Sequence, residues 1–201
     1  MSYSKFTSII QLEERFGLRE QAIDGLFAIE ALPLFVVSER LRLDIEEGRN
    51  MPIKTEKAKS EYFISPILRE LKRQNPHIGL FSGFALNIKG EKDLNGNPDF
   101  ILNARPSSTE INAPIFCLVE IKNKTPDDGF AQCGAEMYAA RLFNKSMGEP
   151  YETIYGAVSN GFEWIFLKLE GDTLFIDTVR YYLGDLTLLL RVLQHIVDQY
   201  K

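Results

Sequence analysis

Three ionisable side chains stand at the ends of two apolar segments of the sequence. Asp99 opens the first segment, and Glu120 and Lys122 close the second. Residues two apart in a strand share a face, so Glu120 and Lys122 are expected on the same face as Phe116 and Leu118. Charged groups that continue a buried stripe in this way need a partner, water or a metal ion, because leaving them dry and unpaired is costly.

A pair of carboxylates on neighbouring strands is expected to bind a cation. If the sheet places the two segments side by side, the carboxylates of Asp99 and Glu120 converge and repel each other unless a cation lies between them. Hard oxygen ligands suit Mg²⁺ or Mn²⁺. Such an ion polarises a phosphate and acidifies water, while a lysine can position that water and offset developing negative charge. The pattern therefore favours phosphodiester hydrolysis.

Two predicted helices supply further candidates. Glu61 shares a helical face with Leu68 and is expected to look toward the core, and Gln132 lies in the first turns of the helix after the second segment. Gln132 could hold substrate backbone or orient water, and Glu136 shares its face as a less certain member of the cluster. Taken singly, these residues read as a turn aspartate, a solvated Glu–Lys pair and a surface glutamine. Their order is what indicates a site.

The elements that position these residues are helices and strands with short connections. Periodicity predicts helices over 55–75, 128–144 and 185–200 and strands over 80–88, 98–103, 115–122, 153–159, 162–169 and 173–179. The first helix is expected to kink or restart at Ser65, before a proline, and Asn160-Gly161 predicts a hairpin turn. Segment 115–122 is apolar on both faces, as in a covered central strand. The order predicts an α/β fold with a mixed central sheet flanked by helices.

The first fifty residues are predicted to form a helical extension. Ile9, Leu12 and Phe16 stand at helical spacing, and a second stripe runs from Leu34 to Ile45. The segment 48–54 contains glycine and proline and is the best candidate linker. We therefore expect an extension over 1–50 and a core domain over 51–201.

The composition narrows the class of protein. The chain has 201 residues, 45% hydrophobic content and a net charge of −5, which is typical of one folded domain. No apolar run approaches the length of a membrane span, and acidic residues precede any stretch that could serve as a signal peptide, so a cytoplasmic location without membrane partners is expected. The negative charge argues against a nonspecific nucleic-acid coat but allows a metal-loaded phosphate site.

Other catalytic classes find little support in the sequence. Cys117 and Cys133 lack CxxC spacing and have only His77 and His195 to share a metal with, so buried free thiols are expected in place of a zinc site. Ser159 lies in VSNG and not in GxSxG, which disfavours a serine hydrolase.

One stretch of the chain is locally basic. Between residues 54 and 73, six basic residues stand against three acidic ones. The stretch could be a phosphate-handling face, and it could equally be an ordinary solvated helix face.

These residues resemble the signature of the PD-(D/E)xK nuclease superfamily. The signature is a helical Glu, then PD, then ExK, then a helix that often carries Gln, and here it reads Glu61, Pro98-Asp99, Glu120-Ile121-Lys122 and Gln132. The following residues, Tyr138 and then YGAVSNGFEWIFLKL, are similar to the N-terminal nuclease domain of type I restriction R subunits. The resemblance covers roughly residues 55–180 and leaves out the first fifty residues and the last helix.

The resemblance implies a fold and a set of roles. The expected core is restriction-endonuclease-like, with the order αβββαβ. Asp99 and Glu120 would bind Mg²⁺ or Mn²⁺, Glu61 would help to hold the metal or its water, Lys122 would assist the attacking water, and Gln132 would support the site. The expected reaction is hydrolysis of DNA. Whether Lys122 acts as a general base or only as a cation is open, because a base would need a pKa far below 10.4.

A second function from another class remains open. A protein with the nuclease fold could bind or regulate without turnover, and the acidic pI near 5.2 and the absence of a DNA-recognition module favour it. The extension over 1–50 could then serve as a partner surface or a homodimer surface.

Overall fold

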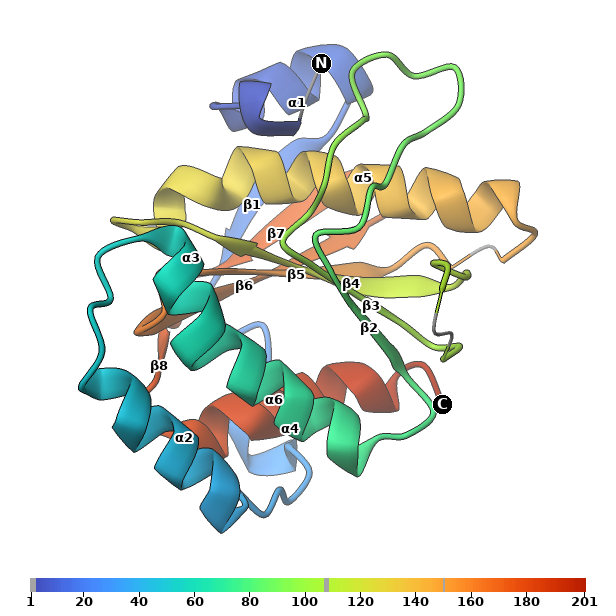
Figure 1. Cartoon of the computed structure of the whole chain (residues 1–201). Helices are drawn as coiled ribbons and strands as arrows, with labels where there is room; N and C mark the ends of the chain where they lie inside the picture. Colours follow the sequence, from blue (N-terminus) through green and yellow to red (C-terminus); the bar gives the residue numbers. More distant parts are fainter. Residues whose placement is uncertain (1–2, 107–108, 150) are drawn as a thin grey trace.

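A mixed β-sheet forms the centre of the computed structural model, which describes residues 3–106, 109–149 and 151–201 (Figure 1). Its strands are β1 (Arg19–Ile23), β2 (Gly79–Ser82), β3 (Phe100–Asn103), β4 (Ile115–Ile121), β5 (Ile154–Ser159), β6 (Glu163–Glu170), β7 (Thr173–Asp177) and β8 (Tyr181–Tyr182). They follow the order β1-β7-β6-β5-β4-β3-β2, and β8 pairs with β6. The pairs β1–β7 and β4–β5 are parallel, and the other neighbours are antiparallel.

Helices cover both faces of the sheet. They are α1 (Ile9–Phe16), α2 (Glu39–Arg49), α3 (Glu56–Lys59), α4 (Ser65–Gln74), α5 (Phe130–Ser146) and α6 (Leu186–Asp198). α1 and α5 lie on one face, while α2, α4 and α6 lie on the other (Figure 1). The predicted α/β class, with a mixed sheet flanked by helices, is confirmed. In the described part of the chain, no helix combines the length and the apolar character needed to cross a membrane.

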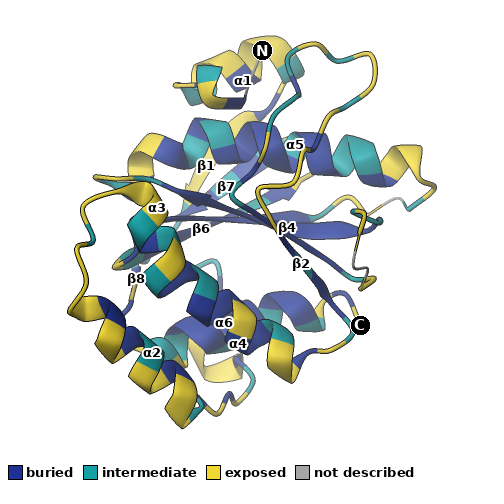
Figure 2. Cartoon of the chain, viewed as in Figure 1, coloured by how far each residue is buried: buried dark blue, intermediate teal, exposed yellow. Residues whose placement is uncertain are grey.

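The central strand β4 is buried along its whole length, as predicted, and the sheet interior is dark blue in Figure 2. The pairing of β3 with β4 shifts register between Leu102 and Asn103. Because of this irregularity, Phe116 joins the core on the α4 and α6 side, where its ring stacks on Tyr200 at 4.9 Å. Leu118 joins the opposite core under α5. The prediction that Phe116 shares the face of Glu120 and Lys122 is therefore wrong.

α5 lies close to the sheet because its inner face carries small residues. A Cβ added at Gly134 would lie 2.8 Å from Leu12 and 2.9 Å from Leu174, which is closer than real side chains approach. The hairpin between β5 and β6 is also confirmed. Gly161 has a φ of 92°. The Asn160 side chain accepts hydrogen bonds from the backbone N–H groups of Phe162 and Glu163.

The prediction that the first fifty residues form a helical extension is wrong in two places. Residues 19–23 form β1, which extends the sheet by parallel pairing with β7. The side chains of β1 are mostly exposed, so the sequence has no alternation of apolar and polar residues that would indicate a strand there. α2 begins only after Ser38, whose side chain accepts a hydrogen bond from the Leu41 N–H. Leu34 precedes it and is 92% exposed. Helix α1 is found where predicted.

The helical segment after residue 55 contains an unexpected π-helical turn. Thr55 caps α3, a π-helical turn follows over Ser60–Ile64, and α4 continues to Gln74. Ser65 does not cap a new helix, because its N–H donates to the Ser60 carbonyl within the turn. A π turn contains one residue more than an α turn and rotates the residues around it relative to α-helical spacing.

Candidate functional site

The site begins where β3 and β4 end together. Asp99 directly precedes β3, and Phe100 pairs with Val119, so Asp99 lies beside the last residues of β4. The carboxylate of Asp99 accepts a hydrogen bond from the backbone N–H of Ile121 at 2.8 Å. This bond fixes the Asp99 carboxylate against the end of β4. The prediction that these two segments are neighbouring strands is confirmed.

Glu120 is a buried carboxylate with one oxygen unused. Its residue is 4% exposed, and Oε1 accepts a hydrogen bond from Nζ of Lys122 at 2.9 Å. Oε2 is buried and has no hydrogen-bond partner among the described residues. Buried polar atoms are normally paired, so this oxygen marks a position where a cation or water would be favoured.

A chain of hydrogen bonds runs from Glu120 into α5. Nζ of Lys122 donates to Glu120 and also to Oε1 of Gln132, at 2.8 Å. The Gln132 amide nitrogen in turn donates to Oε1 of Glu136 at 3.1 Å. The structure thus brings together four residues singled out in the sequence: Glu120, Lys122, Gln132 and Glu136.

Burial raises the pKa values of the two strand carboxyls. Burial raises the pKa of Asp99, and the hydrogen bond from Ile121 opposes this. Burial, and then the charge of Asp99, raise the pKa of Glu120 to about 7, although Lys122 acts in the opposite direction. A carboxyl whose ionisation is disfavoured by burial and by a neighbouring carboxylate, as that of Glu120 is, is stabilised in its charged form by a cation bound beside it.

Lys122 is held in its charged form. Burial alone would lower the pKa of its ammonium group, but the charge and hydrogen bond of Glu120 outweigh burial and raise the pKa. A lysine with a raised pKa is an ammonium ion at neutral pH and has no lone pair with which to accept a proton. This environment favours the cationic role over the role of general base.

The expectation that Glu61 faces the core is wrong. Its side chain is 57% exposed and lies 3.9 Å from Lys57. The π-helical turn explains the difference, because the predicted face assumed regular α-helical spacing through residues 60–64. Glu61 nevertheless lines an open pocket of about 420 Å³ together with Asp99 and Ile121. Its role as a helper of the metal stays a prediction.

Glu56 is a member of this pocket that the sequence analysis missed. It lies in the first turn of α3 and lines the same pocket as Asp99. The charge of Glu56 also raises the pKa values of Asp99, Glu120 and Lys122, although burial and other groups have larger effects. Thr55 is the signal in the sequence that could have identified Glu56. A threonine that caps a helix places the following residue in the first helical turn, and here that turn lies at the site.

Gly129 is a second residue that the sequence analysis missed, and it makes room for Lys122. A Cβ at residue 129 would lie 2.5 Å from Cγ1 of Val158 and 3.1 Å from Cε of Lys122. The φ of −103° is open to any residue, so the constraint is close packing and not backbone conformation.

Gly129→Ala is therefore expected to lower the free energy of unfolding by about 1–3 kcal/mol, because the added methyl overpacks a buried site beside the stiff Val158 side chain. Urea denaturation measures the change. Gly184→Ala is the matched control: no atom lies within 4 Å of its added Cβ, and a change within about 0.5 kcal/mol is expected. Equal stability of the two variants would contradict the tight packing at Lys122.

The basic stretch over 54–73 does not form one continuous basic face. Lys59 is buried, and its Nζ donates to the Asn123 carbonyl; burial lowers its pKa. Arg69 and Arg73 pair with carboxylates. Lys57, by contrast, lines the pocket beside Asp99. The local basic character at the site is therefore limited to the start of the stretch.

The candidate metal ligands are a pair of side chains. Within residues 3–106, 109–149 and 151–201, no group of three His, Cys, Asp or Glu side chains is arranged to hold one metal ion. The pair is Asp99 and Glu120, and the charge of Asp99 raises the pKa of Glu120. No protein-family model and no curated protein matches the sequence. The case for a function therefore depends on the geometry of these residues.

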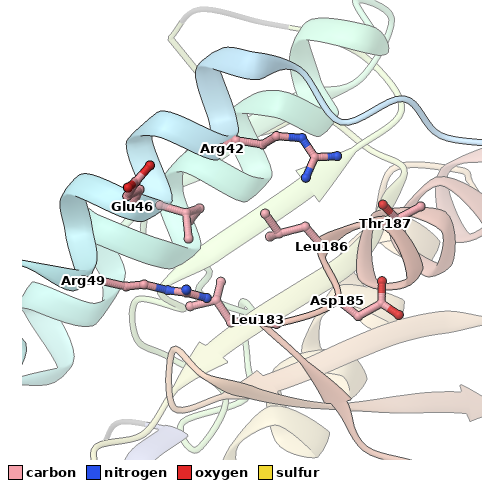
Figure 3. Close-up of a pocket in the computed structure, with 9 residues that line it drawn as sticks. Arg42, Glu46, Arg49, Leu183, Asp185, Leu186 and Thr187 are labelled. Atoms are coloured by element: carbon pink, nitrogen blue, oxygen red, sulfur yellow. The ribbon is translucent and has the colours of Figure 1, made fainter.

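A different pocket, away from this site, carries charges of both signs. It lies between α2 and the start of α6, and is drawn in Figure 3. Arg42 and Arg49 enter it from α2, but so does Glu46, and Asp185 lines the opposite side. This mixture selects neither anions nor cations.

The groups considered for other chemistries have structural surroundings. Cys117 and Cys133 are both free and buried, as predicted, and burial raises the pKa of the Cys117 thiol to about 12. The Ser159 hydroxyl donates a hydrogen bond to the Glu163 carbonyl at 2.8 Å. Burial of the thiols and the hydrogen bond of the Ser159 hydroxyl leave neither the cysteines nor the serine prepared as a nucleophile.

Proposed function

We propose that this chain is a Mg²⁺- or Mn²⁺-dependent nuclease that hydrolyses DNA, and that Asp99, Glu120 and Lys122 form its catalytic centre. The observation that carries the proposal is the meeting of the buried Glu120 carboxyl, the half-buried Asp99 carboxyl and the Lys122 ammonium group where β3 and β4 end, with Asp99 lining an open pocket. In metal-assisted phosphodiester hydrolysis, carboxylates can hold the ion and a cationic side chain can offset developing negative charge. The order of motifs that resembles PD-(D/E)xK nucleases supports the same reading.

Asp99 and Glu120 are the residues that would hold the metal ion. They offer hard carboxylate oxygens, and Oε2 of Glu120 is buried without a partner in the described structure. Burial, and then the charge of Asp99, raise the pKa of Glu120, and a cation bound there would favour its charged form. When bound, Mg²⁺ or Mn²⁺ would polarise the phosphate and lower the pKa of a bound water.

The other residues would orient and stabilise the reacting groups. Lys122 would place its ammonium group beside the phosphate and offset the charge that develops in the transition state. Gln132 holds that ammonium from the side of α5, and the backbone N–H of Ile121 holds the Asp99 carboxylate. Glu56 and Glu61, on the rim of the pocket, could bind metal-bound water.

The proposal is tested by a cleavage assay and a binding assay on the same preparation. Linear, nicked, supercoiled and single-stranded DNA are incubated with Mg²⁺ or Mn²⁺, with EDTA as the control. Cleavage that requires the metal is expected. Mn²⁺ binding without cleavage of any of these DNA forms would favour the alternative function, a nuclease fold used for binding or regulation.

Mn²⁺ binding to the DNA-free protein is expected to depend on pH. Glu120 must lose its proton to bind the ion, and its pKa is about 7. Below that pH, the proton competes with the metal, so the apparent affinity should fall about tenfold per pH unit. Isothermal titration calorimetry at pH 8, 7 and 6 measures this. Affinity that stays constant over the range would contradict the assignment of Glu120 as a ligand.

A further inference from the structure

The orientation of the Gln132 amide is defined from both ends. Its oxygen accepts from Nζ of Lys122 at 2.8 Å, and its nitrogen donates to Oε1 of Glu136 at 3.1 Å. A lysine ammonium only donates, so it requires the oxygen of an amide. The nitrogen must then face an acceptor, and Glu136 supplies it from the next turn of α5.

Glu136 is completely buried. It is 0% exposed, and its second oxygen, Oε2, has no hydrogen-bond partner in the part of the chain that the structure describes. Burial, and then the charge of Glu120, raise its pKa well above the ordinary value. Burial raises the pKa of the nearby Tyr3 hydroxyl, and the charge of Glu136 raises it further. The environment therefore favours the uncharged carboxylic acid.

We propose that Glu136 is a positioning residue, a buried hydrogen-bond acceptor that fixes the Gln132 amide with its oxygen toward Lys122 and thereby keeps the Lys122 ammonium beside Glu120. The inference rests on the proposed function for its catalytic consequence. The hydrogen-bonded arrangement itself exists in the metal-free protein and can be measured there.

The role follows from what Gln132 would do without this acceptor. Its half-buried amide nitrogen would lose its acceptor within the protein, which is costly. Rotation of the amide would then direct its N–H groups at Lys122, so that donors would face donors. Lys122 would keep only its bond to Glu120 and would gain freedom to leave the site.

Two substitutions separate a neutral acceptor from a charged group. Glu136→Gln keeps a carbonyl oxygen at the end of a side chain of the same length and cannot be charged. Glu136→Met keeps the length and removes the acceptor. If Glu136 works as a neutral acceptor, Glu136→Gln should resemble the wild type and Glu136→Met should not.

The first measurement is the reactivity of Lys122 toward acetic anhydride in metal-free protein, followed by mass spectrometry. We expect Glu136→Met to raise the acylation rate of Lys122 by about tenfold, the size expected for losing one hydrogen bond to a charged group, and Glu136→Gln to leave it within about twofold of the wild type. The exposed Lys145 on the same helix is the internal control and should react equally in all three proteins.

Folding and chemistry are checked separately. Urea denaturation should show that Glu136→Met folds with a free energy of unfolding within about 2 kcal/mol of the wild type, since the gain from replacing a buried polar side chain offsets the cost of the unpaired Gln132 amide. The Gln132 side-chain NH₂ signal, assigned by its loss in Gln132→Glu, should exchange slowly with solvent in the wild type and in Glu136→Gln, and faster in Glu136→Met. A folded Glu136→Met with protected Lys122 would overturn the proposal. So would a Glu136→Gln variant with exposed Lys122, because a charged role would then be required.

A DNA cleavage assay then tests independently whether this positioning matters for catalysis. We expect Glu136→Met to cut DNA at least about tenfold more slowly than Glu136→Gln. Wild-type protein that protects Lys122 but cleaves no DNA would uphold the positioning role and sink the proposed nuclease activity. Metal-dependent cleavage that is identical in both variants, with unchanged acylation, would sink the positioning role alone.

Discussion

Lys122→Met is expected to lower the single-turnover rate of Mg²⁺-dependent DNA cleavage by about 10²–10³-fold, the loss typical of removing one donor that stabilises transition-state charge. Methionine approximates the length of the lysine side chain and lacks the ammonium group that bridges Glu120 and Gln132. Mn²⁺ binding to Asp99 and Glu120 should persist, because Lys122 is not a ligand. Calorimetry measures binding, and a quenched-flow assay measures cleavage.

Lys145→Met is the matched control for this experiment. It removes the same charge from an exposed residue in the last turn of α5, far along the helix from Gln132. Its cleavage rate should stay within about threefold of the wild type, because exposed charges interact weakly. Unchanged cleavage by Lys122→Met would contradict the assigned role of the ammonium group. Asp99→Ala, in contrast, should lose both Mn²⁺ binding and cleavage.

Glu120→Gln is expected to stabilise the metal-free protein at pH 8, the second large effect. Glutamine approximates the protonated acid. The folded-state pKa is about 7, raised from an ordinary 4.5, so the wild type gains stability from protonation that is fully present below pH 4.5 and is lost as pH rises through 7. At pH 8, the ionised Glu120 costs up to about 3 kcal/mol, and the substitution should recover about 1–3 kcal/mol.

Urea denaturation with EDTA at pH 4.5 and pH 8 measures this difference. The wild type and Glu120→Gln should have similar stability at pH 4.5 and diverge at pH 8. Adding Mn²⁺ at pH 8 should stabilise the wild type and leave the variant unchanged. Glu47→Gln, at an exposed position of α2, should change stability by less than about 0.5 kcal/mol at either pH. A Glu120→Gln variant that is less stable than the wild type at pH 8 would show that the ion pair with Lys122 dominates.

The residues that the sequence places correctly are those governed by local patterns. β4 was predicted as a covered central strand from its continuous apolar run, and it is buried throughout. Asp99 was predicted to meet the end of this strand, and it accepts a hydrogen bond from Ile121. Gln132 was predicted to support the site from the following helix, and it contacts Lys122. A continuous apolar run and helical spacing are patterns within a single segment, so they can be read directly from the sequence.

The residues that the sequence misplaces depend on irregularities that no local pattern shows. The π-helical turn moves Glu61 to an exposed position, and the register shift between β3 and β4 moves Phe116 to the opposite core. β1 lacks an apolar face and is specified by its partner β7. The space that Gly129 leaves for Lys122 is likewise visible only once the strand and the helix are packed together. Each miss is a tertiary effect that overrides local preference.

The parallel pairing of β1 with β7 also has a consequence for folding kinetics. Arg19–Ile23 pairs with Thr173–Asp177, so almost the whole intervening chain must be available before this ladder can form. Contacts of such long sequence separation slow folding, because the entropy of closing the loop is lost before the contacts form. Until then, β7 presents an open edge able to pair with other chains. In the folded molecule β1 replaces β7 as the edge strand, and its charged Arg19 and Glu20 disfavour edge-to-edge pairing with other chains.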